Sequence, residues 1–256
     1  MSPNVKRVAV IAGIGAGGGT GAASARAFAK EGYSIALIAR NGDSLKAFES
    51  DLKGSGIDAA AFPISSYAGS EISSALQKIR AHFAKPSYEI RAAVWNAVYP
   101  AFKPFLDVTT EDVKGTTECI EGNFAFAREI ILEFKENSID PSNGARGVLI
   151  TTGATSSTRG NTTTSIFSAG KHADRALSQS LAKEFGKQNI HVAYAIIDGG
   201  IITPRSREFR KDPEWEKNEA VRLNPESIAA GYIYLAKQDQ SSWTWELDLR
   251  PAHEKW

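Results

Sequence analysis

The chain has 256 residues, and its 30 Lys and Arg against 29 Asp and Glu leave a formal net charge of +1. Hydrophobic residues make up 42% and charged residues 23%, a balance that excludes a disordered, collagen-like or strongly basic chain. Because the net charge is close to zero, we expect neither nucleic acid nor a membrane surface as a partner.

The single cysteine, Cys119, excludes an internal disulfide and a multi-cysteine metal cage, so we expect a cytoplasmic protein without a metal site. No apolar run approaches the ~20 residues that a membrane span needs. Lys6 and Arg7 precede an apolar run, as in a signal peptide. That run ends in glycines without a small-residue cleavage pattern, and we interpret it as a first strand.

Apolar, strand-like runs recur along the chain at intervals long enough for a helix. They lie at residues 7–14, 33–40, 57–64, 90–97, 145–152, 190–197 and, as a short last run, 245–250. The first six are nearly continuous rather than alternating, which is typical of parallel strands that are covered on both faces.

Helical patterns separate these runs. The expected helices are residues 22–32, 43–53, 70–83, 109–136, 165–187 and 225–235. Strand and helix in alternation predict an α/β fold of the Rossmann-like, doubly wound type, with a parallel sheet of about seven strands. We find no linker, so residues 1–256 are expected to form a single domain. The charged, proline-bounded stretch 204–221 is interpreted as a mobile surface insertion.

A glycine-rich loop, GAGGGTG at residues 15–21, joins the first expected strand to the first helix. A dinucleotide site needs glycine at such a place for a tight turn, for backbone approach to the pyrophosphate and for close helix packing. The helix N-terminus adds unpaired N–H groups and the positive end of its dipole. The loop therefore predicts a phosphate site made by Gly15, Gly17, Gly19, Thr20 and Gly21.

The end of the second expected strand reads Ala39, Arg40, Asn41, without the carboxylate that NAD sites usually offer to the ribose. A guanidinium can instead form a charge-assisted fork with a 2′-phosphate. We therefore predict NADP(H) as cofactor, with Arg40 and Asn41 at the phosphate.

With these motifs in order, the sequence resembles the short-chain dehydrogenase/reductase family over essentially its whole length. Four segments carry the resemblance: the glycine loop, the stretch from Trp95 to Val98 that resembles Asn-Asn-Ala-Gly, the stretch 167–171 that resembles Tyr-x-x-x-Lys, and the stretch 198–203 that resembles a Pro-Gly segment. The resemblance implies a homodimer or homotetramer acting on a small-molecule substrate. It also implies cofactor contacts by Ser65, Asn96, Ala97, Lys171, Gly199, Ile201 and Thr203.

The resemblance also implies a tyrosine acid, a serine that holds the carbonyl oxygen, an asparagine in a proton relay and a lysine. Only the lysine position is kept, as Lys171. Phe167 stands at the tyrosine position, Ala154 at the serine position and Cys119 at the asparagine position. A shifted alignment would restore a serine at Ser156 or Ser157, but none restores the tyrosine. We therefore expect an atypical member.

These departures restrict the chemistry, because phenylalanine cannot donate a proton. Reduction of a ketone builds negative charge on oxygen, and loss of a positioned acid costs about 10²–10⁴ in rate. One alternative is a replacement donor, for which the candidates are Thr155, Ser156, Ser165, His172 and Tyr99. The other is a substrate that already carries positive charge, such as an iminium, which also suits the aromatic face of Phe167.

Three functional hypotheses remain open from the sequence. The first is an NADPH-dependent oxidoreductase that reduces an iminium or another activated acceptor without the usual tyrosine acid. The second is a catalytically silent NADP(H)-binding protein. The third is a biosynthetic enzyme whose cofactor pocket shapes a non-redox cyclisation. The polar stretch 151–165 is either a pocket lining at the edge of the sheet or a simple connection.

Overall fold

The computed structural model describes residues 5–15 and 17–255, and it is built around one sheet. All seven strands are parallel, in the order β3-β2-β1-β4-β5-β6-β7. The strands are β1 (Lys6–Ala12), β2 (Ser34–Ala39), β3 (Ala59–Pro63), β4 (Tyr88–Trp95), β5 (Gly147–Thr152), β6 (Ile190–Ile197) and β7 (Glu246–Leu249). The predicted doubly wound, Rossmann-like α/β class is confirmed.

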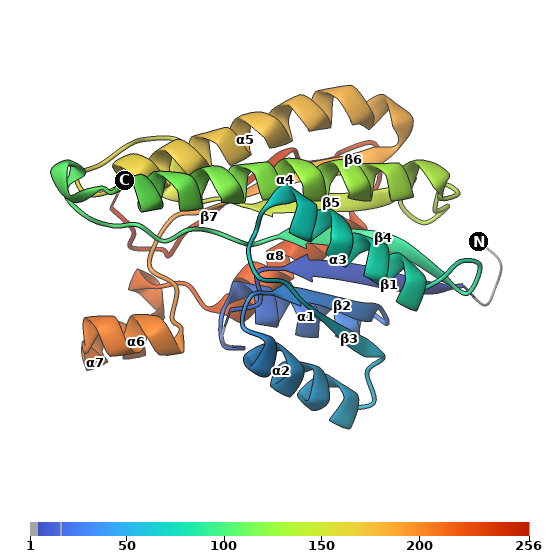
Figure 1. Ribbon diagram of the computed structural model, residues 1–256, viewed down its shortest axis with the longest axis horizontal. Coiled ribbons are helices and arrows are strands. Elements are labelled where there is room, and N and C mark those ends of the chain that lie inside the picture. The colour runs from blue at the N-terminus through green and yellow to red at the C-terminus, as the bar shows by residue number, and fades with distance from the viewer. Residues whose placement is uncertain (1–4, 16, 256) are drawn as a thin grey trace.

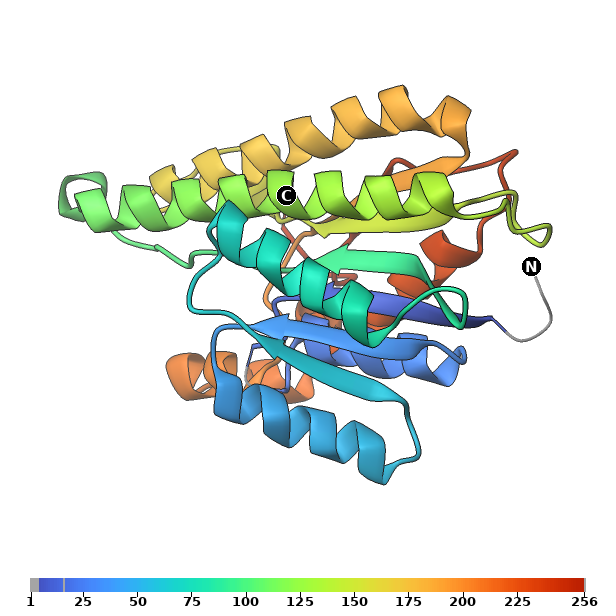
Figure 2. The same cartoon turned by 45° about the vertical axis from the view of Figure 1, so that its right-hand side comes forward.

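Helices cover both faces of the sheet (Figures 1 and 2). One apolar core lies under α3, α4 and α5, and the other under α1, α2 and α8. The longer helices are α1 (Thr20–Lys30), α2 (Gly42–Gly54), α3 (Gly69–His82), α4 (Thr110–Glu136), α5 (Ser165–Phe185) and α8 (Pro225–Lys237). Successive residues of a strand face opposite sides, so Val8 and Val10 enter the first core while Ala9 and Ile11 enter the second.

Residues 204–221, expected to be a mobile surface insertion, contain two short helices. They are α6 (Pro204–Arg210) and α7 (Pro213–Lys217), and they lie in orange beyond the carboxyl edge of the sheet in Figure 1. Each begins with proline after a capping residue, Thr203 or Asp212, whose side chain accepts a backbone N–H. Trp215 of α7 is buried. The segment is therefore an ordered part of the fold.

Short 3₁₀ turns complete the chain. They are η1 (Phe105–Asp107), η2 (Thr155–Ser157), η3 (Gly186–Gln188) and η4 (Glu219–Val221). Within the described residues, no helix is both long and apolar enough to cross a bilayer. The loops that follow β1, β2, β4, β5 and β6 all leave the same edge of the sheet, because every strand runs in the same direction. The predicted site residues are thereby brought to one edge.

Candidate cofactor and substrate site

The glycine loop after β1 has the tight backbone turn that a dinucleotide site needs. Gly13, Gly15 and Gly17 have φ values of 93°, 66° and 85°, a region that residues with a side chain rarely adopt. A Cβ on Gly21 would lie 2.4 Å from the carbonyl oxygen of Gly13, so α1 packs directly against the end of β1. Ala16 lies outside the described residues. Glycine is therefore needed for both the turn and the helix contact.

The start of α1 offers hydrogen-bonding groups. Gly19 is the N-cap residue and supplies no side-chain cap. The hydroxyl oxygen Oγ1 of Thr20 is buried and has no hydrogen-bond partner within the described residues. An uncapped helix N-terminus beside an unpaired hydroxyl fits a phosphate group, because both supply donors to an anion. The predicted phosphate loop is thus chemically suited to a dinucleotide.

Asn96 connects the end of β4 to this loop through a hydrogen bond. Its Nδ2 donates to the carbonyl oxygen of Gly13 over 2.7 Å. A Cβ on Gly13 would meet the backbone N of Ala97 at 2.5 Å. Asn96 therefore shapes the floor on which the glycine loop rests, and Ala97 is buried beside it.

The predicted 2′-phosphate residues lie at the end of β2. Arg40 is exposed, and its guanidinium lies 4.9 Å from the ring centroid of Tyr67. Asn41 accepts a hydrogen bond from the backbone N–H of Ser44 and so caps α2. The side chain of Asn41 is thus already used in the fold, whereas Arg40 is held over a ring with its charge in solvent.

After β3, Ser65 is exposed and its backbone N–H donates to Glu71 of α3 over 3.1 Å. Ser65, for which the resemblance implies a cofactor contact, therefore lies at the carboxyl edge of the sheet with the other predicted site residues.

The connection after β6 covers the glycine loop. A Cβ on Gly18 would meet Cδ of Pro204 at 2.8 Å, and one on Gly19 would meet Cγ2 of Thr203 at 3.7 Å. Gly199 has a φ of 146°, and Ile201 pairs with Leu223 in an isolated parallel bridge. The predicted residues Gly199, Ile201 and Thr203 therefore lie where α6 meets the glycine loop.

Aromatic packing fixes the two short helices over this connection. The Arg210 guanidinium lies 4.4 Å from the centroid of the Trp215 ring. A Cβ on Gly200 would come within 3.0 Å of Trp215 and 3.1 Å of Arg210. Arg207 and Glu216 add an ion pair of 3.5 Å between α6 and α7. The roof of the site is thus a packed pair of helices.

Lys171 lies on α5 with only 5% of its side chain exposed. Its Nζ donates to the carbonyl oxygen of Thr152 over 2.8 Å and to Oδ2 of Asp174 over 3.2 Å. The hydroxyl of Tyr194 donates to the Lys171 carbonyl oxygen over 3.1 Å. Two of the three ammonium N–H bonds thus have acceptors among the residues that the structure describes, which leaves the third for a ligand.

Phe167 and Cys119 border a small hollow that also includes Lys171 and Asp174, between β4, α4 and α5. Burial raises the pKa of the Cys119 thiol to about 11, so the thiol stays protonated at neutral pH. Ala154, the residue expected at the serine position, is the N-cap of η2 and adds no polar side chain. The side chains of Phe167 and Ala154 therefore carry no group that could donate a proton to a substrate.

Two of the five candidate proton donors already donate hydrogen bonds to carboxylates. Tyr99 donates to Oδ1 of Asp112 over 3.2 Å, and this bond raises the pKa of its hydroxyl. Thr155 donates to Oδ1 of Asp198. Hydroxyls engaged in this way are poor acids, because a substrate would have to compete with an anionic acceptor.

The other three candidate donors, Ser156, Ser165 and His172, lie away from the hollow beside Phe167. Ser156 is buried, Ser165 is exposed at the start of α5, and Nδ1 of His172 lies 2.9 Å from the carbonyl oxygen of Ser168. None of the three borders the hollow beside Phe167.

Asp174 and Asn123 belong to the site but are not among the residues predicted from the sequence. Asp174 follows Lys171 by three residues, the spacing at which two helical side chains lie on one face. Nδ2 of Asn123 on α4 donates to Oδ1 of Asp174 over 2.7 Å. The available signal was an acidic residue one turn after the lysine on a helix that faces the core.

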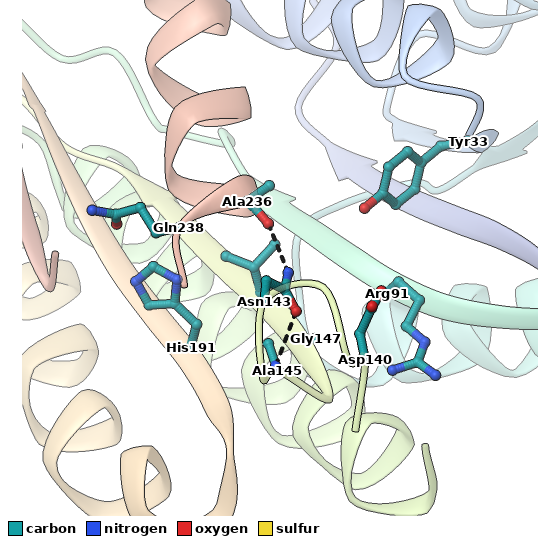
Figure 3. Close-up of a pocket in the computed structure, with 10 residues that line it drawn as sticks. Tyr33, Arg91, Asp140, Asn143, Ala145, Gly147, His191, Ala236 and Gln238 are labelled. Atoms are coloured by element: carbon teal, nitrogen blue, oxygen red, sulfur yellow. Dashed lines mark hydrogen bonds between the residues drawn. The ribbon is translucent and has the colours of Figure 1, made fainter. Parts of the chain in front are cut away.

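A different hollow lies at the amino ends of the strands (Figure 3). It is bordered by Tyr33 and His191, at the beginnings of β2 and β6. There Asn143 donates to the Ala236 carbonyl over 3.1 Å and accepts from the Ala145 N–H over 3.0 Å. These bonds tie α8 to the loop before β5, so the polar groups serve the fold at the edge opposite the glycine loop.

Comparison with known proteins agrees with this architecture. Residues 7–214 match the short chain dehydrogenase family. The chain is 28% identical over 236 residues to glucose 1-dehydrogenase of Gluconobacter oxydans (strain 621H), covering 89% of this chain and 84% of that enzyme. A short-chain dehydrogenase from Rhodopseudomonas palustris is 27% identical, with a TM-score of 0.74 over 96% of this chain and 98% of that one.

The fold is also similar to L-sorbose reductase from Gluconobacter frateurii, a structure complexed with NADPH and L-sorbose. That likeness has a TM-score of 0.81 at 21% identity and covers 100% of both chains. The family match spans most of the chain and includes the glycine loop, the β4 end and the α5 lysine. The chain therefore belongs to the short-chain dehydrogenase family.

Proposed function

We propose that the protein is an NADP(H)-dependent oxidoreductase that reduces a positively charged or otherwise activated small molecule. The observation that carries the proposal is the glycine loop with the unpaired buried hydroxyl of Thr20 at the start of α1. A phosphate group satisfies that hydroxyl and the N–H groups of the first helical turn. The NADPH bound to the sorbose reductase of the same fold supports the choice of coenzyme.

The coenzyme residues follow from their places around the loop. Arg40 recognises the 2′-phosphate, because it is the exposed cation at the end of β2. Lys171 offers its third N–H to a ribose hydroxyl. The other proposed contacts are Gly15, Gly17, Gly19, Thr20, Gly21, Asn41, Ser65, Asn96, Ala97, Gly199, Ile201 and Thr203.

When bound in this loop, NADPH would supply a hydride for an electrophilic carbon of the substrate. Phe167 stands where the family places its acid, and it donates no proton. Without a tyrosine at position 167, the oxyanion formed from a ketone would lack the acid that the family uses, whereas an iminium accepts the hydride to give a neutral amine. The Phe167 ring offers its face to such a cation. The side chains of this site therefore favour a C=N⁺ acceptor.

Consumption of NADPH with matched substrate pairs tests this function. Each pair consists of a cyclic iminium and the ketone of the same carbon skeleton. We expect the iminium to be reduced with a kcat/KM at least about 100 times that of the ketone, the lower end of what a missing acid costs. Equal rates would contradict the cationic acceptor and require a replacement donor. Binding without turnover would favour the silent protein, and product without NADPH consumption would favour the cyclase.

We propose in addition that two copies associate through α4 and α5. Phe124 and Leu132 of α4 are 54% and 44% exposed, and they border an apolar groove with Leu177 and Leu181 of α5. A second α4–α5 face would cover these side chains. Sedimentation analysis should find a dimer or tetramer for the native chain and a monomer for Leu132→Arg. A monomeric native chain would contradict this assembly.

A further inference from the structure

Lys171 and Asp174 form an ion pair inside the protein. Nζ and Oδ2 lie 3.2 Å apart, and the two side chains are only 5% and 8% exposed. Asn123 holds the other carboxylate oxygen over 2.7 Å. The cation that the proposed function places at the coenzyme therefore has a counter-ion within its own helix.

The pair has no net charge when it holds a single shared proton. Burial raises the pKa of Asp174, while the neighbouring Lys171 ammonium and the Asn123 amide act in the opposite direction. As an ammonium and a carboxylate, the two side chains have charges that sum to zero. A buried lysine without Asp174 would instead place a full positive charge at this point of the site.

The ion pair lies beside the same hollow as Phe167. Phe167, Lys171 and Asp174 border one hollow together with Thr116 of α4. The hydroxyl of Thr116 is buried and has no hydrogen-bond partner in the part of the chain that the structure describes. The hollow thus presents an aromatic face, a neutralised lysine and an unused hydroxyl.

An uncompensated ammonium would repel a cation in this hollow, because charges interact strongly where water is scarce. We propose that Asp174 is a specificity-determining residue, which cancels the charge of Lys171 and thereby admits a positively charged acceptor to the face of Phe167. This inference rests on the proposed function. It assigns to Asp174 a role in selecting the charge of the substrate, beyond its hydrogen bond to Asn123.

Two unreactive ligands of one shape test the proposal. They are the N,N-dimethyl-tetrahydroisoquinolinium cation and its carbon isostere, 2,2-dimethyltetralin. Both are titrated into NADPH-saturated protein, and the ratio of their dissociation constants is compared among variants. Asp174→Asn removes the counter-charge, and Asp174→Glu keeps it. Lys171→Met removes the ammonium. Glu226→Gln, in the exposed first turn of α8, is the control for loss of an acidic group.

We expect Asp174→Asn to lower the preference for the cation by about tenfold, the effect of an added ~1.4 kcal/mol of repulsion. Asp174→Glu should restore the native ratio, and Lys171→Met should raise the preference for the cation. Glu226→Gln should leave it unchanged. A merely structural Asp174 would weaken both ligands equally, so a constant ratio in Asp174→Asn and Lys171→Met would overturn the inference.

The native protein separates this inference from the proposed function. Failure of the native chain to bind NADPH, or equal reduction of iminium and ketone, would overturn the function itself. A native enzyme that prefers iminium substrates but keeps its cation preference in Asp174→Asn would overturn only the role of Asp174. Circular dichroism and the NADPH dissociation constant of each variant show whether its fold and coenzyme site are intact.

Discussion

The Phe102 and Phe167 rings lie 4.6 Å apart between centroids and are inclined at 43°. Phe102 belongs to the connection between β4 and α4 and is 58% exposed, whereas Phe167 borders the hollow that contains Lys171. The two rings therefore form a continuous aromatic surface from solvent to the interior of the proposed substrate site. Neither ring carries a proton donor, and the hydroxyls of Tyr99 and Thr116 border the same hollow.

Phe167→Tyr should increase ketone reduction, because it places a hydroxyl on a ring that borders the same hollow as Lys171. A gain of at least about tenfold in kcat/KM for the ketone is expected, a part of the 10²–10⁴ that a positioned acid contributes. Adding Ala154→Ser should increase it further. Steady-state kinetics with the paired ketone and iminium provide the measurement.

Phe102→Tyr is the matched control for that prediction, since it adds the same hydroxyl to the outer ring of the pair. It should leave ketone reduction unchanged. An equal gain in both variants would show that any polar group on this wall is sufficient, and the assignment of position 167 would then be wrong.

Arg40→Gln should weaken NADPH binding by about tenfold or more, because a charge-assisted fork to the 2′-phosphate is lost. NADH lacks that phosphate, so its affinity should change little. Fluorescence titration with both coenzymes measures the difference. Lys46→Gln, which removes another exposed cation on α2, is the control. A parallel loss for both coenzymes in Arg40→Gln would assign the arginine a merely structural role.

Gly21→Ala should destabilise the protein by about 1–3 kcal/mol, the usual cost of forcing extra atoms into a packed site. Its Cβ would lie 2.4 Å from the Gly13 carbonyl oxygen. Gly54→Ala is the matched change, since a Cβ at the end of α2 meets nothing within 4 Å, and it should stabilise by about 0.5–1 kcal/mol. Urea unfolding distinguishes them, and equal effects would contradict the tight contact between α1 and β1.

Asp112 should contribute stability that is lost in acid. The Lys103 ammonium, followed by the Thr109 backbone N–H, holds the pKa of its carboxyl below the ordinary value of 3.8. A group with a lowered folded pKa stabilises the protein above its unfolded pKa and loses that effect as the pH falls toward the folded value. Asp112→Asn should therefore be less stable than the native chain at pH 7.

The same variant should lose less stability on acidification than the native chain does. The difference in unfolding free energy between the two proteins should shrink as the pH falls below about 3.8, the carboxyl pKa of the unfolded chain. Chemical unfolding at a series of pH values measures it. A difference that stays constant with pH would show that Asp112 acts through shape alone.

Much of the architecture follows from local patterns in the sequence. The apolar runs predict all seven strands, because parallel strands covered on both faces need them, and the spacing predicts the crossover helices. Boundaries shift by a few residues. The first strand ends at Ala12, and α1 begins at Thr20, because the glycine loop occupies the residues between them.

The remaining features depend on contacts between distant segments. Helices α6 and α7 are too short to show a periodic pattern, and they are ordered by two caps and by Trp215 packing on Gly200. In the sequence alone, Asp174 looks like any exposed acidic residue on a long helix. Its role becomes visible only when α4 brings Asn123 to it.

Calorimetric titration of the folded native protein with NADPH and NADH tests the proposed coenzyme. We expect saturable heat with NADPH and an affinity for NADH at least about tenfold weaker, since only NADPH carries the phosphate that Arg40 would recognise. Equal affinity for the two coenzymes would contradict the role of Arg40. No heat with NADPH would contradict the assignment of the glycine loop itself.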